Sequence, residues 1–337
     1  MLPISEIRRI SKTVDENWRS PEADAVAAAW GLPEGAALWL RSSATHVFVV
    51  PAPGGTEPPT YLRFAPEGSP GGAKLGSSAP LLNGWAERGL GAVQPIPSTN
   101  GQLCETVETP DGRAVAMLVP AAAGAELSVD DLSSGQAAEW GAALAGLHAT
   151  GNALPEPALP KVHVPAVPDQ AAGMQQPDGL PGRPIDRAIR AVRAEIEALD
   201  PDQHSQGTCH GDFELDNIRF GPAGVTFFDA DEAHHGWFAA DVALAVRDLT
   251  GTTLDSRARP ELLAAFLAGY RRRRPFTAPE EASLPLHSLA ASARMVRQLA
   301  NVLDAGSGDR PEWVRALDAS LREHQGWHRE RLLRNRV

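Results

Sequence analysis

Alternating and clustered apolar residues predict strands in the first third of the chain. Residues 44–50 (ATHVFVV) end at Pro51 and a Gly-Gly turn, and residues 60–64 (TYLRF) form a second apolar run. Runs of β-branched and aromatic residues bounded by Gly and Pro are typical of strands. These two runs therefore predict an antiparallel hairpin, and two further strands are predicted around residues 103–107 and 114–119.

Helical periodicity dominates the rest of the chain. A short helix that stops at Gly31 is predicted over residues 22–31, and an amphipathic helix over 79–89 follows a loop at 66–72. From Val129 onward the period changes, and residues 134–149 place Trp140 and Leu144 on one helical stripe. Further helices are predicted over 185–199, 260–273, 284–304 and 311–334, and a long Pro- and Gly-rich loop over 151–183.

This order of elements predicts a two-lobed α+β protein. A small antiparallel β-rich lobe would cover residues 1–120, and a larger helical lobe would cover residues 121–337. The chain has 337 residues, of which 43% are hydrophobic, so it can bury one large or two modest cores.

Charge and composition exclude several classes of function. A formal net charge of −11 argues against nucleic acid as the main partner, because binding phosphodiesters needs a basic surface. The two cysteines, Cys104 and Cys209, lie in no metal-binding spacing. No apolar run suits a signal peptide or a membrane span, so we expect a cytoplasmic protein without a membrane partner. Its oligomeric state stays open.

One segment carries the residue types that phosphoryl transfer needs. Residues 209–220 (CHGDFELDNIRF) are followed by residues 225–231 (VTFFDAD). The reaction needs a carboxylate to accept the proton of the attacking hydroxyl, and hard oxygen ligands for Mg²⁺ on the nucleotide phosphates. Asp212 can supply the base, and Asn217, five positions later, can supply one ligand. Asp229 ends a short apolar strand that would hold it rigidly towards the same space.

The pattern His210-Gly211-Asp212-xxxx-Asn217 followed by Phe228-Asp229 is similar to the aminoglycoside phosphotransferase superfamily. That superfamily shares the protein-kinase fold and includes choline, homoserine and methylthioribose kinases and a stress-response Ser/Thr kinase. Residues 61–64 (YLRF), 94–101 (QPIPSTNG) and 144–148 (LAGLH) resemble further family landmarks in the expected order, so the resemblance spans roughly the whole chain.

The resemblance implies ATP and Mg²⁺ as cofactors and assigns roles residue by residue. Asp212 resembles the catalytic base, and His210 resembles the residue that braces the catalytic loop. Asn217 and Asp229 resemble the metal ligands. The remaining implied positions are the adenine-binding hinge at Leu118, Val119 and Ala121, a buried acid at Asp241 that supports the catalytic loop, a second metal contact or solvated acid at Asp231, and an acceptor-pocket or packing residue at Trp237.

The nucleotide-binding half departs from the family pattern. Arg63 stands where the family has its nucleotide-binding lysine, and the helix that carries the partner glutamate has Ser77 and Ser78 near the expected place. The only acid of that helix, Glu87, lies towards its far end, and the phosphate-covering turn at 41–45 (RSSAT) has no glycine. We expect Arg63 to replace the lysine–glutamate pair, with no acid of residues 74–88 in contact with it.

These features predict an ATP-dependent phosphotransferase that acts on a hydroxyl of a small molecule, such as an aminoglycoside-like antibiotic, an amino alcohol or a sugar. Two alternatives stay open. The landmarks at 61–64 and 94–101 also fit a protein Ser/Thr kinase of the stress-response type. The departures at Arg63 and on the following helix favour a pseudokinase, a binding module that transfers phosphate poorly, whereas Asp212, Asn217 and Asp229 oppose it.

Overall fold

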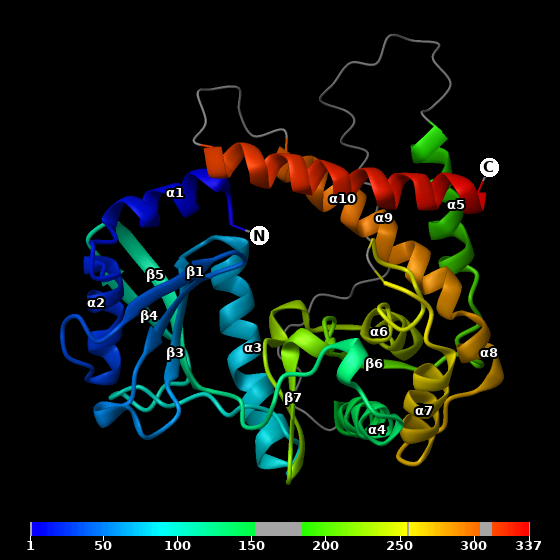
Figure 1. Cartoon of the computed structure of the whole chain (residues 1–337), viewed down its shortest axis with the longest axis horizontal. Helices are drawn as coiled ribbons and strands as arrows, with labels where there is room; N and C mark the ends of the chain where they lie inside the picture. The colour runs from blue at the N-terminus through cyan, green and yellow to red at the C-terminus, as the bar shows by residue number, and fades with distance from the viewer. Residues whose placement is uncertain (1, 152–183, 255, 304–311, 337) are drawn as a thin grey trace. The chain divides into compact units, whose positions relative to one another are not determined.

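The computed structural model describes residues 2–151, 184–254, 256–303 and 312–336 (Figure 1). By their contacts these residues form two compact units. Unit 1 comprises the described residues within Met1–Leu132, Ala145–Leu159 and His210–Ala233, and unit 2 those within Ser133–Leu144, Pro160–Cys209 and His234–Val337. This grouping differs from the predicted boundary after residue 120, because residues 210–233 make most of their contacts within the β-rich unit.

Unit 1 contains a five-stranded antiparallel sheet. Its strands are β1 (Leu38–Ser42), β2 (His46–Val50), β3 (Thr60–Pro66), β4 (Glu105–Thr109) and β5 (Gly112–Pro120), in the order β1-β2-β3-β5-β4. The predicted hairpin is confirmed: β2 pairs with β3, with Phe48 opposite Leu62. The strands predicted around 103–107 and 114–119 are confirmed as β4 and β5, whereas β1 was not predicted.

The two faces of the sheet have different neighbours. Leu62 and Phe64 of β3 belong to an apolar core that also contains Ile10 of α1 (Ile4–Thr13) and Val26 of α2 (Pro21–Ala27). Because side chains alternate along a strand, Arg63 points to the other face. Helix α3 (Pro70–Glu87) packs there against β3 and β5 (Figure 1). As predicted, the helical segment after residue 21 stops at Gly31, which has a left-handed φ of 69°, after the short 3-10 helix η1 (Ala28–Trp30).

Helix α3 begins earlier than its sequence indicates. The predicted loop at 66–72 and helix start at residue 79 are wrong at this boundary, since the helix begins at Pro70 after an N-cap at Ser69, whose Oγ accepts a 3.1 Å hydrogen bond from the Gly72 amide. Gly71 and Gly72 made the start of the helix difficult to predict from the sequence, because glycine has a low helix propensity. Both are required by close packing: a Cβ on Gly71 would lie 2.7 Å from the Ala44 carbonyl oxygen.

A second, smaller hairpin completes the part of unit 1 that carries the motif. It is formed by β7 (Ile218–Gly221) and β8 (Gly224–Phe227), preceded by the short 3-10 helix η4 (Leu215–Asn217) and followed by η5 (Ala230–Glu232). The chain after α3 pairs with this hairpin, since the Phe227 amide donates to the Gly91 carbonyl at 2.7 Å. Helix α3 also packs against η5.

Unit 2 is mainly helical, and the helices predicted over 185–199, 260–273, 284–304 and 311–334 are confirmed with small shifts at their ends. Its helices α5, α9 and α10 share an apolar core that includes Val192, Leu289 and Leu332. Helices α6 and α8 were not predicted. None of the helices in the described part of the chain is long and apolar enough to span a bilayer. The long loop predicted over residues 151–183 lies outside the described residues, except for residue 151. The elements are α4 (Ser134–Gly151, shared with unit 1), α5 (Pro184–Glu197), β6 (Gln206–Cys209), β9 (His234–Trp237), α6 (Phe238–Ala245), α7 (Pro260–Arg271), α8 (Ala278–Ala282), α9 (Leu284–Leu303) and α10 (Glu312–Arg336).

Candidate active site

Asp212 and Asn217 are joined directly by hydrogen bonds. The Asn217 side-chain amide donates to the Asp212 carbonyl at 2.9 Å and to the Asp212 carboxylate Oδ2 at 3.0 Å. The Asn217 carbonyl accepts from the Phe228 amide at 3.1 Å, which ties this loop to the residue before Asp229. Asn217 Oδ1 accepts no hydrogen bond from the described residues, so it remains as an oxygen that can meet a cation.

His210 and Gly211 fix the backbone around this pair. His210 is fully buried, and its Nε2 donates to the Phe228 carbonyl at 3.2 Å while its ring packs among Trp85, Phe213 and Phe227. Gly211 has a left-handed φ of 82°, and a Cβ there would overlap the Glu232 carbonyl. The motif therefore needs glycine at this position, both for its conformation and for its close approach to η5.

Asp229 lies between β8 and η5 in a backbone conformation that is rare for residues other than glycine. Its φ and ψ are both 62°, and such conformations persist only where the surrounding structure imposes them. The Asp229 side chain is 28% exposed and accepts a 3.2 Å hydrogen bond from Arg63 Nη2. It is thus a half-buried carboxylate held at a strained turn, in the same unit as Asp212 and Asn217.

Arg63 is held through one of its two terminal nitrogens. Its Nη2 donates to Asp231 Oδ2 at 2.6 Å and to Asp229 Oδ1 at 3.2 Å, and it lies 3.5 Å from the Thr45 hydroxyl. Asp231 Oδ1 in turn accepts from the Ser78 hydroxyl of α3 at 3.3 Å. Within the described residues, Arg63 Nε and Nη1 donate to no protein atom, so their N–H groups remain available for an anion.

The hydrogen bonds of Arg63 in the described structure go to Thr45, Asp229 and Asp231, and none goes to an acid within residues 74–88. Glu87 instead accepts from the Asn83 side-chain amide at 2.8 Å. Sequence reasoning missed Lys74, which forms an ion pair with Glu232 and so links α3 to η5. The helical pattern that would have revealed Lys74 was obscured by the glycines at the start of α3.

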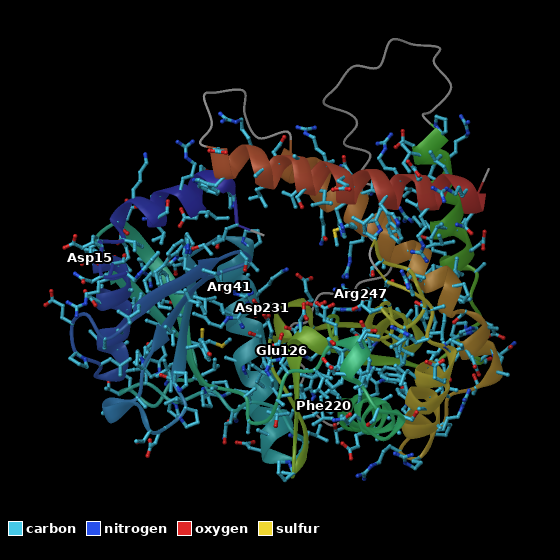
Figure 2. All side chains as sticks on the ribbon, viewed as in Figure 1. Asp15, Arg41, Glu126, Phe220, Asp231 and Arg247 are labelled. Carbon is cyan, nitrogen blue, oxygen red and sulfur yellow. The ribbon has the colours of Figure 1, made fainter. Side chains whose placement is uncertain are left out.

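The electrostatics of the three charged groups differ. Burial raises the pKa of Asp229, but the charges of Arg63, His210 and Arg41 outweigh burial and hold this pKa below the usual value. Arg41 and Asp231 are labelled in Figure 2. Burial raises the pKa of Asp231 to about 6, and repulsion from Asp229 adds to this. Burial alone would lower the pKa of Arg63, but Asp231 and Asp229 raise it above the ordinary value. Arg63 therefore remains a cation.

The predicted hinge residues lie at the end of β5. The Leu118 carbonyl already accepts from the Ile96 amide at 2.8 Å, and the Ala121 amide donates to the Pro59 carbonyl at 3.0 Å. Val119 lies opposite Tyr61 in the sheet. Two of the backbone groups predicted to bind adenine are thus engaged within the protein, and the role of this segment stays a prediction.

Asp241 and Trp237 belong to unit 2. Asp241 is fully buried on α6, as its predicted supporting role requires. It lies near Cys209, where burial raises the pKa of the thiol well above its usual value and the Asp241 charge adds to the effect. Trp237 on β9 packs edge-on against His204, with ring centroids 6.1 Å apart. The roles of both residues stay predictions.

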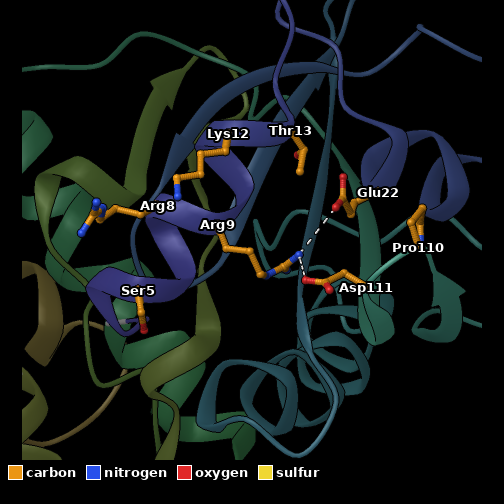
Figure 3. Close-up of a pocket in the computed structure, with 8 residues that line it drawn as sticks. All are labelled: Ser5, Arg8, Arg9, Lys12, Thr13, Glu22, Pro110 and Asp111. Atoms are coloured by element: carbon orange, nitrogen blue, oxygen red, sulfur yellow. Dashed lines mark ion pairs between the residues drawn. The ribbon is translucent and has the colours of Figure 1, made fainter.

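A separate groove of about 590 Å³ lies near the N-terminus of unit 1 (Figure 3). Arg9 crosses it and forms ion pairs with Glu6, Glu22 and Asp111. Its charge is thereby neutralised, and the groove contains none of the motif residues. The residues lining it are Ser5, Arg8, Arg9, Lys12, Thr13, Glu22, Pro110 and Asp111.

Comparison with known proteins points to one family. The sequence model of the phosphotransferase enzyme family matches residues 81–276, more than half of the chain. The chain is 32% identical over 231 residues to an uncharacterized protein of Deinococcus radiodurans, covering 66% of this chain and 65% of that protein. It is 28% identical over 272 residues to a homoserine kinase of Caulobacter vibrioides, covering 75% and 78% of the two chains.

Solved structures show the same fold at low sequence identity. An amicoumacin kinase in complex with AMP-PNP and Ca²⁺ superposes with a TM-score of 0.70 at 14% identity, covering 92% of this chain and 91% of the other. A microcompartment-associated aminopropanol kinase superposes with a TM-score of 0.65 at 20% identity, covering 93% and 97%. The predicted two-lobed, kinase-like α+β fold is therefore confirmed.

Proposed function

Because this chain belongs to the phosphotransferase enzyme family, we propose that it transfers the γ-phosphate of ATP to a hydroxyl group of a small molecule. The observation that supports this most strongly is the double hydrogen bond from the Asn217 amide to the backbone and carboxylate of Asp212. It fixes the proposed base and one proposed metal ligand in a single rigid loop. Rigid placement matters because phosphoryl transfer is catalysed mainly by positioning and charge.

Asp212 is the proposed general base. Its carboxylate accepts the proton of the acceptor hydroxyl while the acceptor oxygen forms a bond to the γ-phosphorus and the bond from that phosphorus to the ADP oxygen breaks. The products are the phosphorylated acceptor, ADP and one proton. The Asn217 amide orients the carboxylate for this transfer, and His210 holds the loop to the Phe228 carbonyl.

The oxygen donors around Asp229 fit Mg²⁺. Asp229 supplies a half-exposed carboxylate with a lowered pKa, and Asn217 Oδ1 supplies an amide oxygen without a hydrogen-bonding partner among the described residues. Hard oxygen ligands of this kind are those that Mg²⁺ prefers. When bound, the ion would neutralise charge on the nucleotide phosphates.

Arg63 is the proposed phosphate contact from the sheet. Its guanidinium is buried, permanently charged and anchored at Nη2, while Nε and Nη1 have no protein acceptor among the described residues. Each of these N–H groups can donate a charge-assisted hydrogen bond to a phosphate oxygen. Arg41 on β1, in the turn that lacks glycine, contributes a second positive charge near Asp229.

The acceptor class is proposed from chemistry and from the relatives together. Homoserine kinases, an aminopropanol kinase and an amicoumacin kinase are among the similar proteins. We propose an alcohol-bearing metabolite or antibiotic, with amino alcohols, aminoglycoside-like antibiotics and sugars as the first candidates. A location in the cytoplasm, where ATP is available, stays a prediction.

An ATP-consumption screen against hydroxylated metabolites, antibiotics and generic protein substrates tests the function. We expect phosphorylation of one small-molecule class, and Asp212→Asn should lower turnover by about two orders of magnitude or more while the fold stays intact. Phosphorylation of proteins alone would favour the stress-response type of Ser/Thr kinase. Nucleotide binding without turnover on any acceptor would favour the pseudokinase.

A further inference from the structure

Arg63 forms ion pairs with both Asp231 and Asp229, but the two pairs differ in length and in burial. Asp231 lies closer to Nη2, at 2.6 Å against 3.2 Å. Its side chain is 4% exposed, whereas that of Asp229 is 28% exposed. A short, buried, charge-assisted hydrogen bond is harder to break than a long and half-exposed one, because its partners would be left desolvated.

Both oxygens of Asp231 are engaged by the protein. Oδ2 receives Arg63 from β3, and Oδ1 receives the Ser78 hydroxyl from α3 at 3.3 Å. Asp231 therefore connects β3 of the sheet to α3, the helix that packs on one face of that sheet. In contrast, Asp229 has a single described hydrogen bond, to Arg63.

We infer that Asp231 is a positioning residue, the fixed counter-ion that holds Arg63 in place for the nucleotide phosphates, so that Asp229 is left to the metal. This inference rests on the proposed function. The acid that orients the phosphate-binding cation is supplied by η5, and α3 contributes Ser78 as a hydrogen-bond donor to it. Asp231 and Asp229 hold the guanidinium at Nη2, and the N–H groups of Nε and Nη1 have no protein acceptor among the described residues.

A double-mutant cycle on nucleotide binding tests the assignment and needs no acceptor. Calorimetric titrations with Mg-ATP, and with ADP in the absence of metal, would compare wild type, Asp231→Asn, Arg63→Met and the double variant. If Asp231 acts through Arg63, Asp231→Asn should lower the affinity for both nucleotides about tenfold. In the Arg63→Met background the same substitution should change the affinity by less than about twofold. The double variant removes both buried charges and so keeps the cycle informative if Asp231→Asn folds poorly.

Moving the carboxylate to another position near Arg63 should restore nucleotide affinity. Ser78→Glu combined with Asp231→Ser moves the carboxylate onto α3 within reach of Arg63, and it should restore affinity to within about threefold of wild type. Glu232→Gln is the matched control, because Glu232 also links η5 to α3 but pairs with Lys74. We expect that control to bind nucleotide within about twofold of wild type.

Two results would overturn the inference. One is a loss from Asp231→Asn that persists in the Arg63→Met background and appears only with Mg-ATP, which would make Asp231 a metal ligand. The other is an Asp231→Asn protein that binds both nucleotides like wild type. A wild-type protein that binds no nucleotide would instead contradict the proposed function, so the two failures are distinguishable.

Discussion

At the scale of single residues, Asp229 combines a strained backbone with a half-exposed carboxylate. A left-handed conformation at a non-glycine residue costs free energy, on the order of 1–3 kcal/mol, that the surrounding structure has to offset. Here the hydrogen bonds of Asn217 and His210 to Phe228 fix the preceding residue. The carboxylate is thereby placed where it can bind a cation.

Replacing Asp229 should remove the metal dependence of nucleotide binding. In Asp229→Ala the affinity for ATP should no longer increase on addition of Mg²⁺, because the principal carboxylate ligand is absent. Calorimetric titration with and without Mg²⁺ measures this. Asp229→Asn keeps a residue that tolerates positive φ and separates loss of charge from loss of conformation. The matched control is Asp216→Ala, an exposed acid of the same loop, and unchanged metal dependence in both Asp229 variants would contradict the assignment.

Arg63 should matter for nucleotide binding and Glu87 should not. Arg63→Ala removes the proposed charge-assisted phosphate contact, at a cost of about 1.5–3 kcal/mol, or roughly ten- to a hundredfold in affinity or rate. Glu87→Ala removes an exposed acid that bonds only to Asn83 among the described residues, and it should behave like wild type. Nucleotide titrations of the two variants provide the comparison. Equal losses in both would show that Glu87 reaches the nucleotide site after all.

At the scale of elements, α3 shows how packing can override helix propensity. Its first turn contains Gly71 and Gly72, where any side chain would meet the backbone of Ala44 or Pro66. The Ser69 cap and Pro70 at the first position start the helix despite these residues. The helix can therefore approach the sheet closely, and it brings Ser78 to Asp231.

Two glycines of α3 should respond to alanine in opposite directions. Gly71→Ala places a Cβ 2.7 Å from the Ala44 carbonyl oxygen, so it should lower the free energy of unfolding by about 1–3 kcal/mol. At Gly76 a Cβ meets nothing within 4 Å, and Gly76→Ala should raise the free energy of unfolding by about 0.5–1 kcal/mol. Urea denaturation of both variants measures the difference. A Gly71→Ala protein as stable as wild type would show that α3 can move away from the sheet.

At the scale of the whole molecule, buried histidines in unit 2 couple stability to pH. His287 on α9 is 3% exposed, and its Nε2 has no hydrogen-bond partner among the described residues. Burial lowers its pKa to about 4, and the nearby His204 contributes. An unfolded histidine takes up its proton at about pH 6.5. Between these values the unfolded state binds more protons, so stability must fall as pH falls.

His287→Phe should reduce this pH dependence. For the wild type, His287 alone should lower the free energy of unfolding by about 2 kcal/mol between pH 7.5 and pH 5. The free energy of unfolding of the phenylalanine variant should fall by correspondingly less over this pH range, because phenylalanine has no group that binds a proton. Urea denaturation at several pH values, followed through unit 2, gives both curves. Parallel curves for the two proteins would mean that His287 is not held neutral.

The sequence by itself determined the fold class, most of the element order and the residues proposed for the catalytic loop. Strand and helix periods are local properties, so β2, β3, β4, β5 and the long helices could be predicted from neighbouring residues. The pattern from His210 to Asp229 could also be recognised, because a tight loop and a short hairpin place its members together with few degrees of freedom.

Only the tertiary structure decided which charges meet. Arg63 and Asp231 are separated by 168 positions in the chain, and no local period predicts that a strand of the main sheet will pair with η5. The start of α3 was hidden for the same reason, since its glycines are required by contacts with Ala44 and Pro66. Long-range packing therefore determined the partner of Arg63, the proposed phosphate-binding cation, which the sequence had shown only as a missing glutamate.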